Sequence, residues 1–115
     1  MAGYIFIINK VLEPEEFKEY SQRGIPLVKE FGGKFRIVGL DAEQLEGPER
    51  LRGAVAVILE FDSVQEAKAF WTSEKYQEAK KAREGRAEFI VFVTGSNWMS
   101  QSQGYEFMDN LLRKT

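Results

Sequence analysis

Three hydrophobic stretches of this chain are apolar at both alternating positions of a β-strand, instead of alternating between apolar and polar residues. Residues 54–61 place Val, Val, Leu and Phe at one parity, and Ala, Ala and Ile at the other before Glu60; residues 4–8 and 89–93 are similarly two-sided. Helices on one side of a four-stranded sheet bury only one parity of each strand. The pattern therefore predicts that the second face is also covered, most simply by the same face of a second copy.

The order of elements along the chain predicts the fold class. Strands are expected at 3–10, 34–40, 54–61 and 88–94, and helices at 14–31, 63–72 and 73–84. Pro14 suits the first turn of a helix, Pro26 predicts a kink or a break into two pieces, and Ser63 with Glu66 has the spacing of a capping box. Strand–helix–strand–strand–helix–strand is the ferredoxin-like βαββαβ unit, an α+β fold with a four-stranded antiparallel sheet whose first and third strands are central.

The second strand is predicted to lie at the edge of that sheet, because it carries basic side chains. Simple alternation places Phe35 and Ile37 on one face, and Lys34, Arg36 and Val38 on the other.

Residues 96–115 follow the complete unit of residues 1–95 and are interpreted as a C-terminal extension. After a polar linker at 100–104, apolar residues recur at helical spacing and predict a short amphipathic helix. We expect this helix to contribute to assembly, with Trp98 packed beneath it and a docking face made of Tyr105, Phe107, Met108, Leu111 and Leu112.

Composition removes several classes of function. The 115 residues suit one domain, and 16 basic against 18 acidic residues give a formal charge of −2 with no basic face, so nucleic-acid binding is not expected. The absence of Cys and His argues against disulfides, a metal site, a cofactor and the usual general base. No apolar stretch is long enough to cross a membrane, and the start lacks the features of a signal peptide, so a cytoplasmic location is expected.

Several short motifs in order resemble one known family. They are Gly32-Gly33-Lys34-Phe35-Arg36, Leu45-Glu46-Gly47, Glu60-Phe61-Asp62-Ser63, Ala67, Phe70, Ser73-Glu74-Lys75-Tyr76-Gln77 and Arg83. Over residues 4–95 the chain resembles the domain of unknown function 1330, a member of the dimeric α+β barrel superfamily. The resemblance implies two sheets paired face to face in a homodimer. Relatives in that superfamily include cofactor-independent monooxygenases of antibiotic biosynthesis, small isomerases and dehalogenase-like proteins; those that use a histidine are not models for this chain.

Glu60 and Arg36 are the candidates for catalysis. Glu60 shares a strand parity with small and apolar residues, which predicts a carboxylate in a poorly hydrated space where it could transfer a proton. If the second and third strands pair with residue numbers summing near 96, Arg36 lies opposite Glu60. The alternative interpretation is therefore a purely structural ion pair.

Trp71, Ser73, Tyr76 and Arg83 are the candidates for ligand binding. Tyr76 and Arg83 are seven residues apart, close to two helical turns, and so lie on nearly one helix face. Together with Ser73 they could recognise a carboxylate or a carbonyl group. The alternatives are a local ion pair of Arg83, and core packing of the two aromatic residues.

These observations support two hypotheses of function. The first is a homodimeric α+β barrel protein that is structural or binds a small molecule, such as a carbonyl compound held between sheet and helices. The second is a cofactor-independent enzyme of the isomerase or monooxygenase type, acting on a small carbonyl-containing or aromatic substrate. A cavity lined by Glu60, Arg36 or Tyr76 would favour the enzyme, whereas a filled core would favour the first hypothesis.

Overall fold

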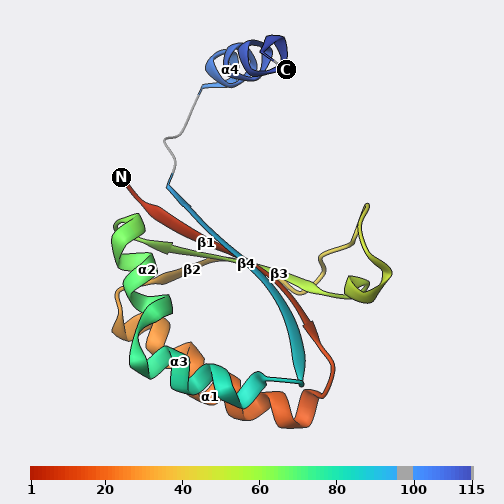
Figure 1. Ribbon diagram of the computed structural model, residues 1–115, viewed down its shortest axis with the longest axis vertical. Coiled ribbons are helices and arrows are strands. Elements are labelled where there is room, and N and C mark those ends of the chain that lie inside the picture. The colour runs from red at the N-terminus through yellow and green to blue at the C-terminus, as the bar shows by residue number, and fades with distance from the viewer. Residues whose placement is uncertain (96–99, 115) are drawn as a thin grey trace.

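A four-stranded antiparallel sheet forms the centre of the computed structural model, which describes residues 1–95 and 100–114 (Figure 1). The strands follow the order β2-β3-β1-β4 across the sheet, so that β1 and β3 are central as predicted. The elements are β1 Gly3–Val11, α1 Pro14–Glu30, β2 Lys34–Gly39, η1 Glu49–Leu51, β3 Val55–Phe61, α2 Val64–Thr72, α3 Glu74–Lys80, η2 Lys81–Arg83, β4 Ala87–Gly95 and α4 Gln101–Arg113. This order confirms the ferredoxin-like α+β fold.

Local sequence signals set most of the helix ends. Ser63 accepts a hydrogen bond from the backbone N–H of Glu66 (3.0 Å), and Ser73 accepts one from Tyr76 (3.1 Å), so α2 and α3 begin at side-chain caps. The predicted division of α1 at Pro26 is wrong, because one continuous helix runs through it. Pro26 and Gln22, one turn earlier, are both exposed, so water can satisfy the carbonyl that loses its partner.

A bulge in β2 changes which side chains face the helices. The register with β3 is Lys34 opposite Glu60, Phe35 opposite Leu59, Ile37 opposite Ile58 and Val38 opposite Val57. Arg36 is the extra residue, so the predicted pairing of Arg36 directly opposite Glu60 is wrong, as is the predicted placing of Ile37 with Phe35. After the bulge, Phe35 and Val38 lie on the helix side and Ile37 on the opposite face.

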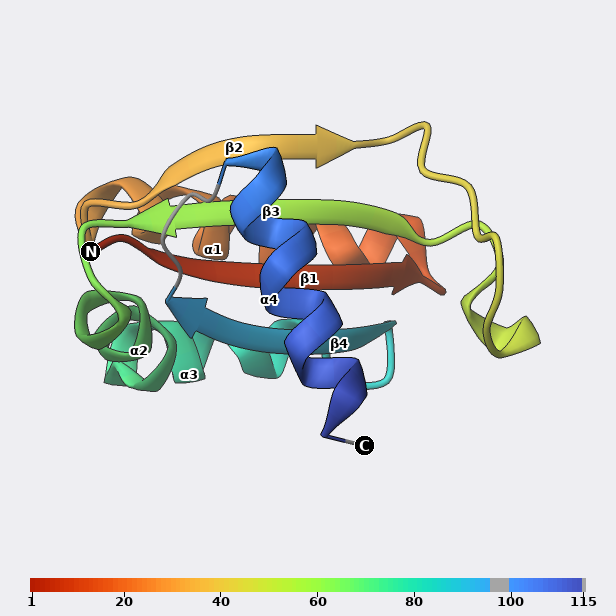
Figure 2. The same ribbon diagram turned by 90° about the horizontal axis from the view of Figure 1, so that it is seen from above.

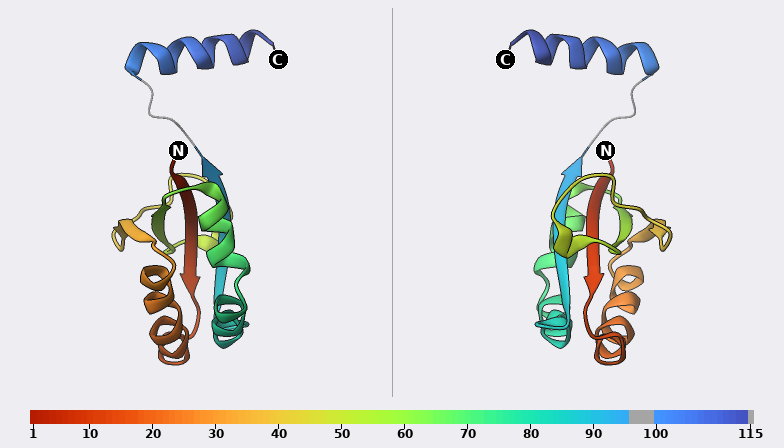
Figure 3. Two further views of the ribbon diagram at one scale, coloured as in Figure 1. Left: turned by 90° about the vertical axis from the view of Figure 1, so that its left-hand side faces the viewer. Right: turned by 90° about the vertical axis from the view of Figure 1, so that its right-hand side faces the viewer.

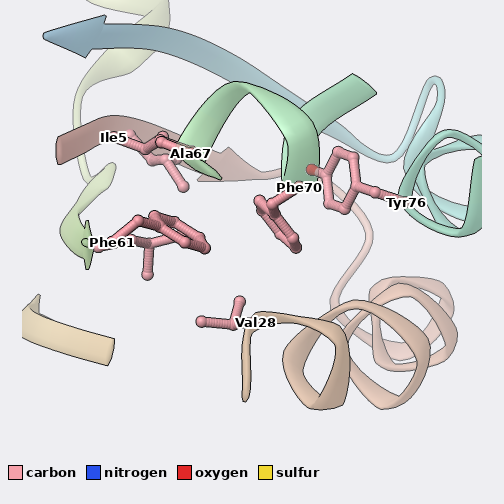
Figure 4. Packing of buried hydrophobic residues seen from close by; sticks show 8 residues of the cluster. Ile5, Val28, Phe61, Ala67, Phe70 and Tyr76 are labelled. Carbon is pink, nitrogen blue, oxygen red and sulfur yellow. The ribbon is translucent and has the colours of Figure 1, made fainter. Parts of the chain in front are cut away.

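The helices α1, α2 and α3 all lie on one face of the sheet (Figures 1 and 3). The buried core between the layers comes from β1, β3 and the three helices, and Figure 4 shows its packing. Aromatic rings dominate this core: the centroid of Phe70 lies 5.3 Å from that of Phe61 and 4.8 Å from that of Tyr76. Its members are Ile5, Ile7, Val28, Leu59, Phe61, Ala67, Phe70 and Tyr76.

The other face of the sheet, the open face, carries a cross-strand row of apolar side chains. Phe6 lies opposite both Ile58 and Phe92, and Ile8 lies opposite Ile90. Phe92, in the edge strand β4, is 67% exposed, and Phe6, in the central strand β1, is 40% exposed, so large apolar side chains of this face lie in water in the single chain. The two-sided strands thus produce one buried face and one apolar face that α1, α2 and α3 leave uncovered.

The C-terminal helix α4 stands apart from the sheet, on the side of the open face (Figures 1 and 2). Ser100 caps it, and Gln103 completes a capping box, so the polar linker expected at 100–104 is wrong: four of these residues are helical. The Ser-x-x-Gln spacing of Ser100 and Gln103 is the sequence signature of this capping box, so the start of the helix was predictable. No residue of α4 is buried, including the expected docking residues, and the expected packing of Trp98 lies outside the described residues.

Candidate functional site

A cavity of about 170 Å³ lies between α1 and the helix-covered face of the sheet. Every strand and each of α1, α2 and α3 contributes to its wall, which is mainly aliphatic and aromatic. Ile25, Phe35 and Val38 line it and are exposed, so the cavity opens between α1 and the edge strand β2. An engineered apolar cavity of about 150 Å³ holds benzene, so this space is suited to a molecule about one ring in size.

Two tyrosine hydroxyl groups meet in the wall of this cavity. The hydroxyl oxygen of Tyr20 in α1 lies 2.8 Å from that of Tyr76 in α3. One hydroxyl donates to the other, which leaves one proton free to donate elsewhere. Burial raises the pKa of Tyr20 well above its usual range, the neighbouring Tyr76 raises it further, and the charge of Arg83 acts in the opposite direction. The Tyr20 hydroxyl is thus neutral near neutral pH and can donate a hydrogen bond.

Arg83, in η2, is a buried cation at the same wall. The residue is 7% exposed, its Nε atom has no hydrogen-bond partner, and no carboxylate forms an ion pair with it among the residues that the structure describes. Its guanidinium carbon lies 3.7 Å from the ring centroid of Phe89, 5.5 Å from Tyr20 and 6.0 Å from Trp71. All three rings line the cavity, so the charge borders the cavity behind its aromatic wall.

Burial of the Arg83 side chain has a desolvation cost, which its aromatic neighbours reduce. Removing a guanidinium group from water costs several kcal/mol, whereas a desolvated cation–π contact returns about 2 kcal/mol. The rings and the contact with the Tyr20 hydroxyl offset part of this cost.

Asn9 is a further polar residue of the wall that sequence reasoning missed. It lies in β1 at the same parity as the buried Ile5 and Ile7, and its Oδ1 atom is buried without a partner among the described residues. A polar residue at a strand position that otherwise faces the core could have identified Asn9 as a candidate site residue. Tyr20 was also missed as a site residue, because helical periodicity placed it only on an apolar face.

The structure brings some of the predicted site residues together and separates others. Trp71 and Tyr76 line the cavity, and Arg83 borders it. Ser73 caps α3 and donates its own hydroxyl proton to the carbonyl of Phe70 (2.7 Å), which leaves it in the backbone framework rather than in the wall. Of the three residues whose place in a cavity wall would favour the enzyme, Tyr76 lines this cavity, and Glu60 and Arg36 do not. The binding and catalytic roles of these residues stay predictions.

Glu60 and Arg36 lie on the open face, away from this cavity. Arg36 Nε donates to Glu60 Oε1 at 2.7 Å, so the expected ion pair is present although the register differs. The side chains are 49% exposed for Arg36 and 25% for Glu60, so the expected placing of Glu60 in an enclosed space is wrong for the single chain.

A double-mutant cycle should measure this ion pair. Because the pair is partly exposed, we expect Arg36→Met and Glu60→Gln to couple by about 0.5 to 1 kcal/mol in the free energy of unfolding. Arg36→Met alone should cost more than it does beside Glu60→Gln, since it leaves the carboxylate without its partner. Urea unfolding of the four proteins gives the coupling energy, and strictly additive effects would contradict a direct pair.

Alkaline unfolding should report the tyrosine pair. The pKa of Tyr20 is raised in the folded chain, so its contribution to stability is complete below the ordinary tyrosine value of 10.0 and is lost as the pH rises above it. A difference of one bound proton between the folded and unfolded chains changes the free energy of unfolding by about 1.4 kcal/mol per pH unit. The free energy of unfolding of Tyr20→Phe should therefore fall less steeply with pH than that of the natural chain in this range. Denaturant unfolding at a series of alkaline pH values tests this, with Tyr105→Phe in the exposed α4 as control; equal slopes for Tyr20→Phe and the natural chain would refute it.

The described residues contain no cluster of His, Cys, Asp or Glu that could hold a metal ion. None of the helices in residues 1–95 and 100–114 combines the length and apolar character needed to cross a bilayer.

Comparisons with known proteins agree with this architecture. The family model described as Domain of unknown function (DUF1330) matches residues 2–96. The RPA0582 protein of unknown function from Rhodopseudomonas palustris is 22% identical with a TM-score of 0.58, and the match covers 83% of this chain and 85% of that one. SnoaB, a cofactor-independent oxygenase from Streptomyces nogalater, is 11% identical with a TM-score of 0.59, covering 87% and 97%.

A de novo designed protein, Foldit4, is 17% identical with a TM-score of 0.53, covering 84% of this chain and all of its own. At these identities the structures show a shared fold only, and a designed protein among them illustrates that this fold does not itself imply an activity. Among curated proteins, none matches the chain.

Proposed function

This chain belongs to the family of the domain of unknown function DUF1330, and we propose that it is a cytoplasmic, homodimeric protein that binds a small molecule between its sheet and helices. The observation that carries the proposal is the cavity of about 170 Å³ with aromatic walls and the paired hydroxyls of Tyr20 and Tyr76. Ligand sites are typically apolar hollows with a few polar groups that fix orientation, and this cavity has that composition. Its volume restricts the ligand to about one ring with one or two polar atoms.

A second candidate function is cofactor-independent catalysis on such a ligand. The tyrosine pair favours it, because a buried neutral hydroxyl is a fixed donor for a carbonyl oxygen on which negative charge develops. The positive charge of Arg83 beside Tyr20 would stabilise the same developing charge. The likeness in fold to SnoaB is consistent with this candidate but adds no residue to it.

We assign the second copy to the open face. Its apolar row includes Phe6, Ile8 and Phe92, which are all exposed in the single chain, and contiguous exposed apolar side chains often mark an interface. Packing against the same face of a second chain would bury both rows around a two-fold axis. The mass of the chain is 13.2 kDa, so light scattering should give twice this value at micromolar concentration.

We further propose that α4 supports this assembly, as an extension beyond the family domain. A chain that ends at Gly95 should melt a few degrees lower or dimerise more weakly, while its core stays folded; about 1 kcal/mol shifts the melting temperature of a domain this size by roughly 4 °C. Leu111→Ser on the apolar side of α4 should have the same effect in part, whereas Asp109→Ser is the matched control. Identical melting and mass for the shortened chain would refute the assignment.

The binding proposal can be tested with a variant that fills the cavity. Ser21 in α1 lines the cavity, and the adjacent Gln22 is exposed and does not. Native mass spectrometry of the purified natural chain should show a bound small molecule, or binding of added one-ring compounds. Ser21→Leu should abolish that binding, because the larger side chain occupies the ligand space, whereas Gln22→Leu should keep it.

Fluorescence gives a second measurement of the same event. The chain has two tryptophans, so a Trp98→Phe background leaves Trp71, which lines the cavity, as the only one. Its emission should respond to ligand in the natural and Gln22→Leu chains and stay constant in Ser21→Leu. Binding that survives Ser21→Leu unchanged would place the ligand elsewhere and overturn the proposal.

A further inference from the structure

We propose that the natural ligand of the cavity is an anion, a compact one-ring or branched carboxylate or its acidic enol equivalent, held in the field of Arg83. This inference rests on the proposed function, because it specifies the charge of the ligand for the same cavity. Shape and volume alone would admit neutral and charged ligands equally.

One buried formal charge borders the cavity. Its lining residues include no Asp, Glu, Lys or Arg, and the guanidinium group of Arg83 lies behind three of its aromatic rings. That group is buried, has no acidic partner among the described residues, and lies against the three aromatic rings and beside the Tyr20 hydroxyl. In such an environment a charge acts over several ångströms with little screening, and a cavity beside it has a positive potential.

The polar atoms of the wall can complete the recognition of a carboxylate. The Tyr20–Tyr76 pair has one proton left to donate, and it lies on the side of the cavity where Arg83 approaches Tyr20. Asn9 has both a donor and an acceptor on its amide group; the atom that is buried without a partner is the acceptor Oδ1, so a carboxylate would be bound by Nδ2 after the amide turns by about 180°. One oxygen of a carboxylate could thus accept from the tyrosine pair and the other from the Asn9 amide.

The alternative is that Arg83 serves only to hold the three rings together. The two explanations differ in what happens when the charge is removed. If Arg83 is mainly a structural cation, Arg83→Met loses the cation–π contacts and lowers the melting temperature of the ligand-free protein. If it is the counter-ion of a ligand, Arg83→Met removes an unneutralised buried charge and leaves the melting temperature of the ligand-free chain unchanged or raised.

The decisive probes are benzoate and benzamide, which have nearly the same size and shape and differ in charge at neutral pH. Calorimetric titration of the full-length natural chain should show benzoate binding about tenfold more tightly than benzamide, as a charge-assisted contact would produce. In Arg83→Met the ratio should fall to about one or below. Arg86→Met is the matched control, because it removes the same charge from a neighbouring residue that pairs with Glu19, and it should keep the natural ratio.

The outcomes separate this inference from the proposed function. Preference for benzoate that disappears in Arg83→Met and persists in Arg86→Met supports the inference. Equal binding of both probes by the natural chain overturns the inference and leaves the binding cavity supported. Binding of neither probe, with no bound molecule in native mass spectra, overturns both. A loss of stability in ligand-free Arg83→Met, together with an unchanged probe ratio, assigns Arg83 a structural role only and also overturns the inference.

Discussion

Phe92→Asp should convert the protein from a dimer to a folded monomer. Phe92 is 67% exposed in the single chain and lies opposite Phe6 on the open face, in the edge strand β4, so the fold does not depend on its burial. In a two-fold dimer each substitution occurs twice. Loss of a well-buried interface aromatic costs about 2 kcal/mol, so two copies cost about 4 kcal/mol, or roughly a thousandfold in the dimer Kd. The added carboxylate would increase this further, since it would be desolvated in the interface.

Light scattering and circular dichroism together test this result. Phe92→Asp should halve the measured mass and keep the far-UV spectrum of the natural chain. Leu12→Asp is the control: it also places a carboxylate at an exposed apolar position, but outside the sheet, and should leave the mass unchanged. A natural chain that is already monomeric at micromolar concentration, or a Phe92→Asp chain that remains dimeric, would refute the open face as the interface.

Phe70→Ala should have the largest effect on stability. Phe70 is 1% exposed and packs against Phe31, Phe61 and Tyr76, with ring centroids 4.8 to 5.8 Å apart. Truncating such a residue to alanine typically costs 3 to 5 kcal/mol, as the sum of lost transfer energy and the cavity that remains. Domains of this size have a total stability of about 5 to 15 kcal/mol, so the variant should be near its limit at room temperature.

Urea unfolding measures this cost directly. Phe70→Leu, which keeps most of the apolar volume, should lose less than half as much, and Phe107→Ala in the exposed α4 should change the stability by under about 1 kcal/mol. If Phe70→Ala cost no more than Phe107→Ala, the ring cluster would not be the centre of the core.

The sequence was sufficient to predict the topology, because the pattern of apolar residues within each strand indicates where the strand lies in the sheet. The two-sided pattern of β1, β3 and β4 predicted one face against helices and a second apolar face covered by another copy; both apolar faces are present, and the covering of the second stays a prediction. The bulge at Arg36 could not be predicted in the same way. One extra residue in a strand leaves composition and alternation nearly intact, yet it moves Val38 from the open face to the mouth of the cavity.

The candidate site was predictable only within single elements. Helical spacing related Tyr76 to Arg83, and both meet at the cavity wall with Trp71. Tyr20 and Asn9 reach the same wall from α1 and β1, and their proximity depends on how α1 lies over the sheet rather than on any local pattern. Conversely, Glu60 followed the parity expected of it, but that parity faces the open side, and nothing in the sequence distinguished the two faces.

Adjacent residues of β3 lie on the cavity side and on the open face, so ligand binding and dimerisation could be thermodynamically linked. Val57 lines the cavity and Ile58 points to the opposite side, so the proposed ligand and the proposed second copy would be separated by the thickness of a single sheet. If binding of one shifted β3, the other would respond, and such coupling is reciprocal: a ligand that tightens the dimer by some factor is bound more tightly by the dimer by that same factor. Occupancy of the cavity would then vary with the concentration of the protein itself, so its apparent ligand affinity would be a property of the assembly and not of one chain.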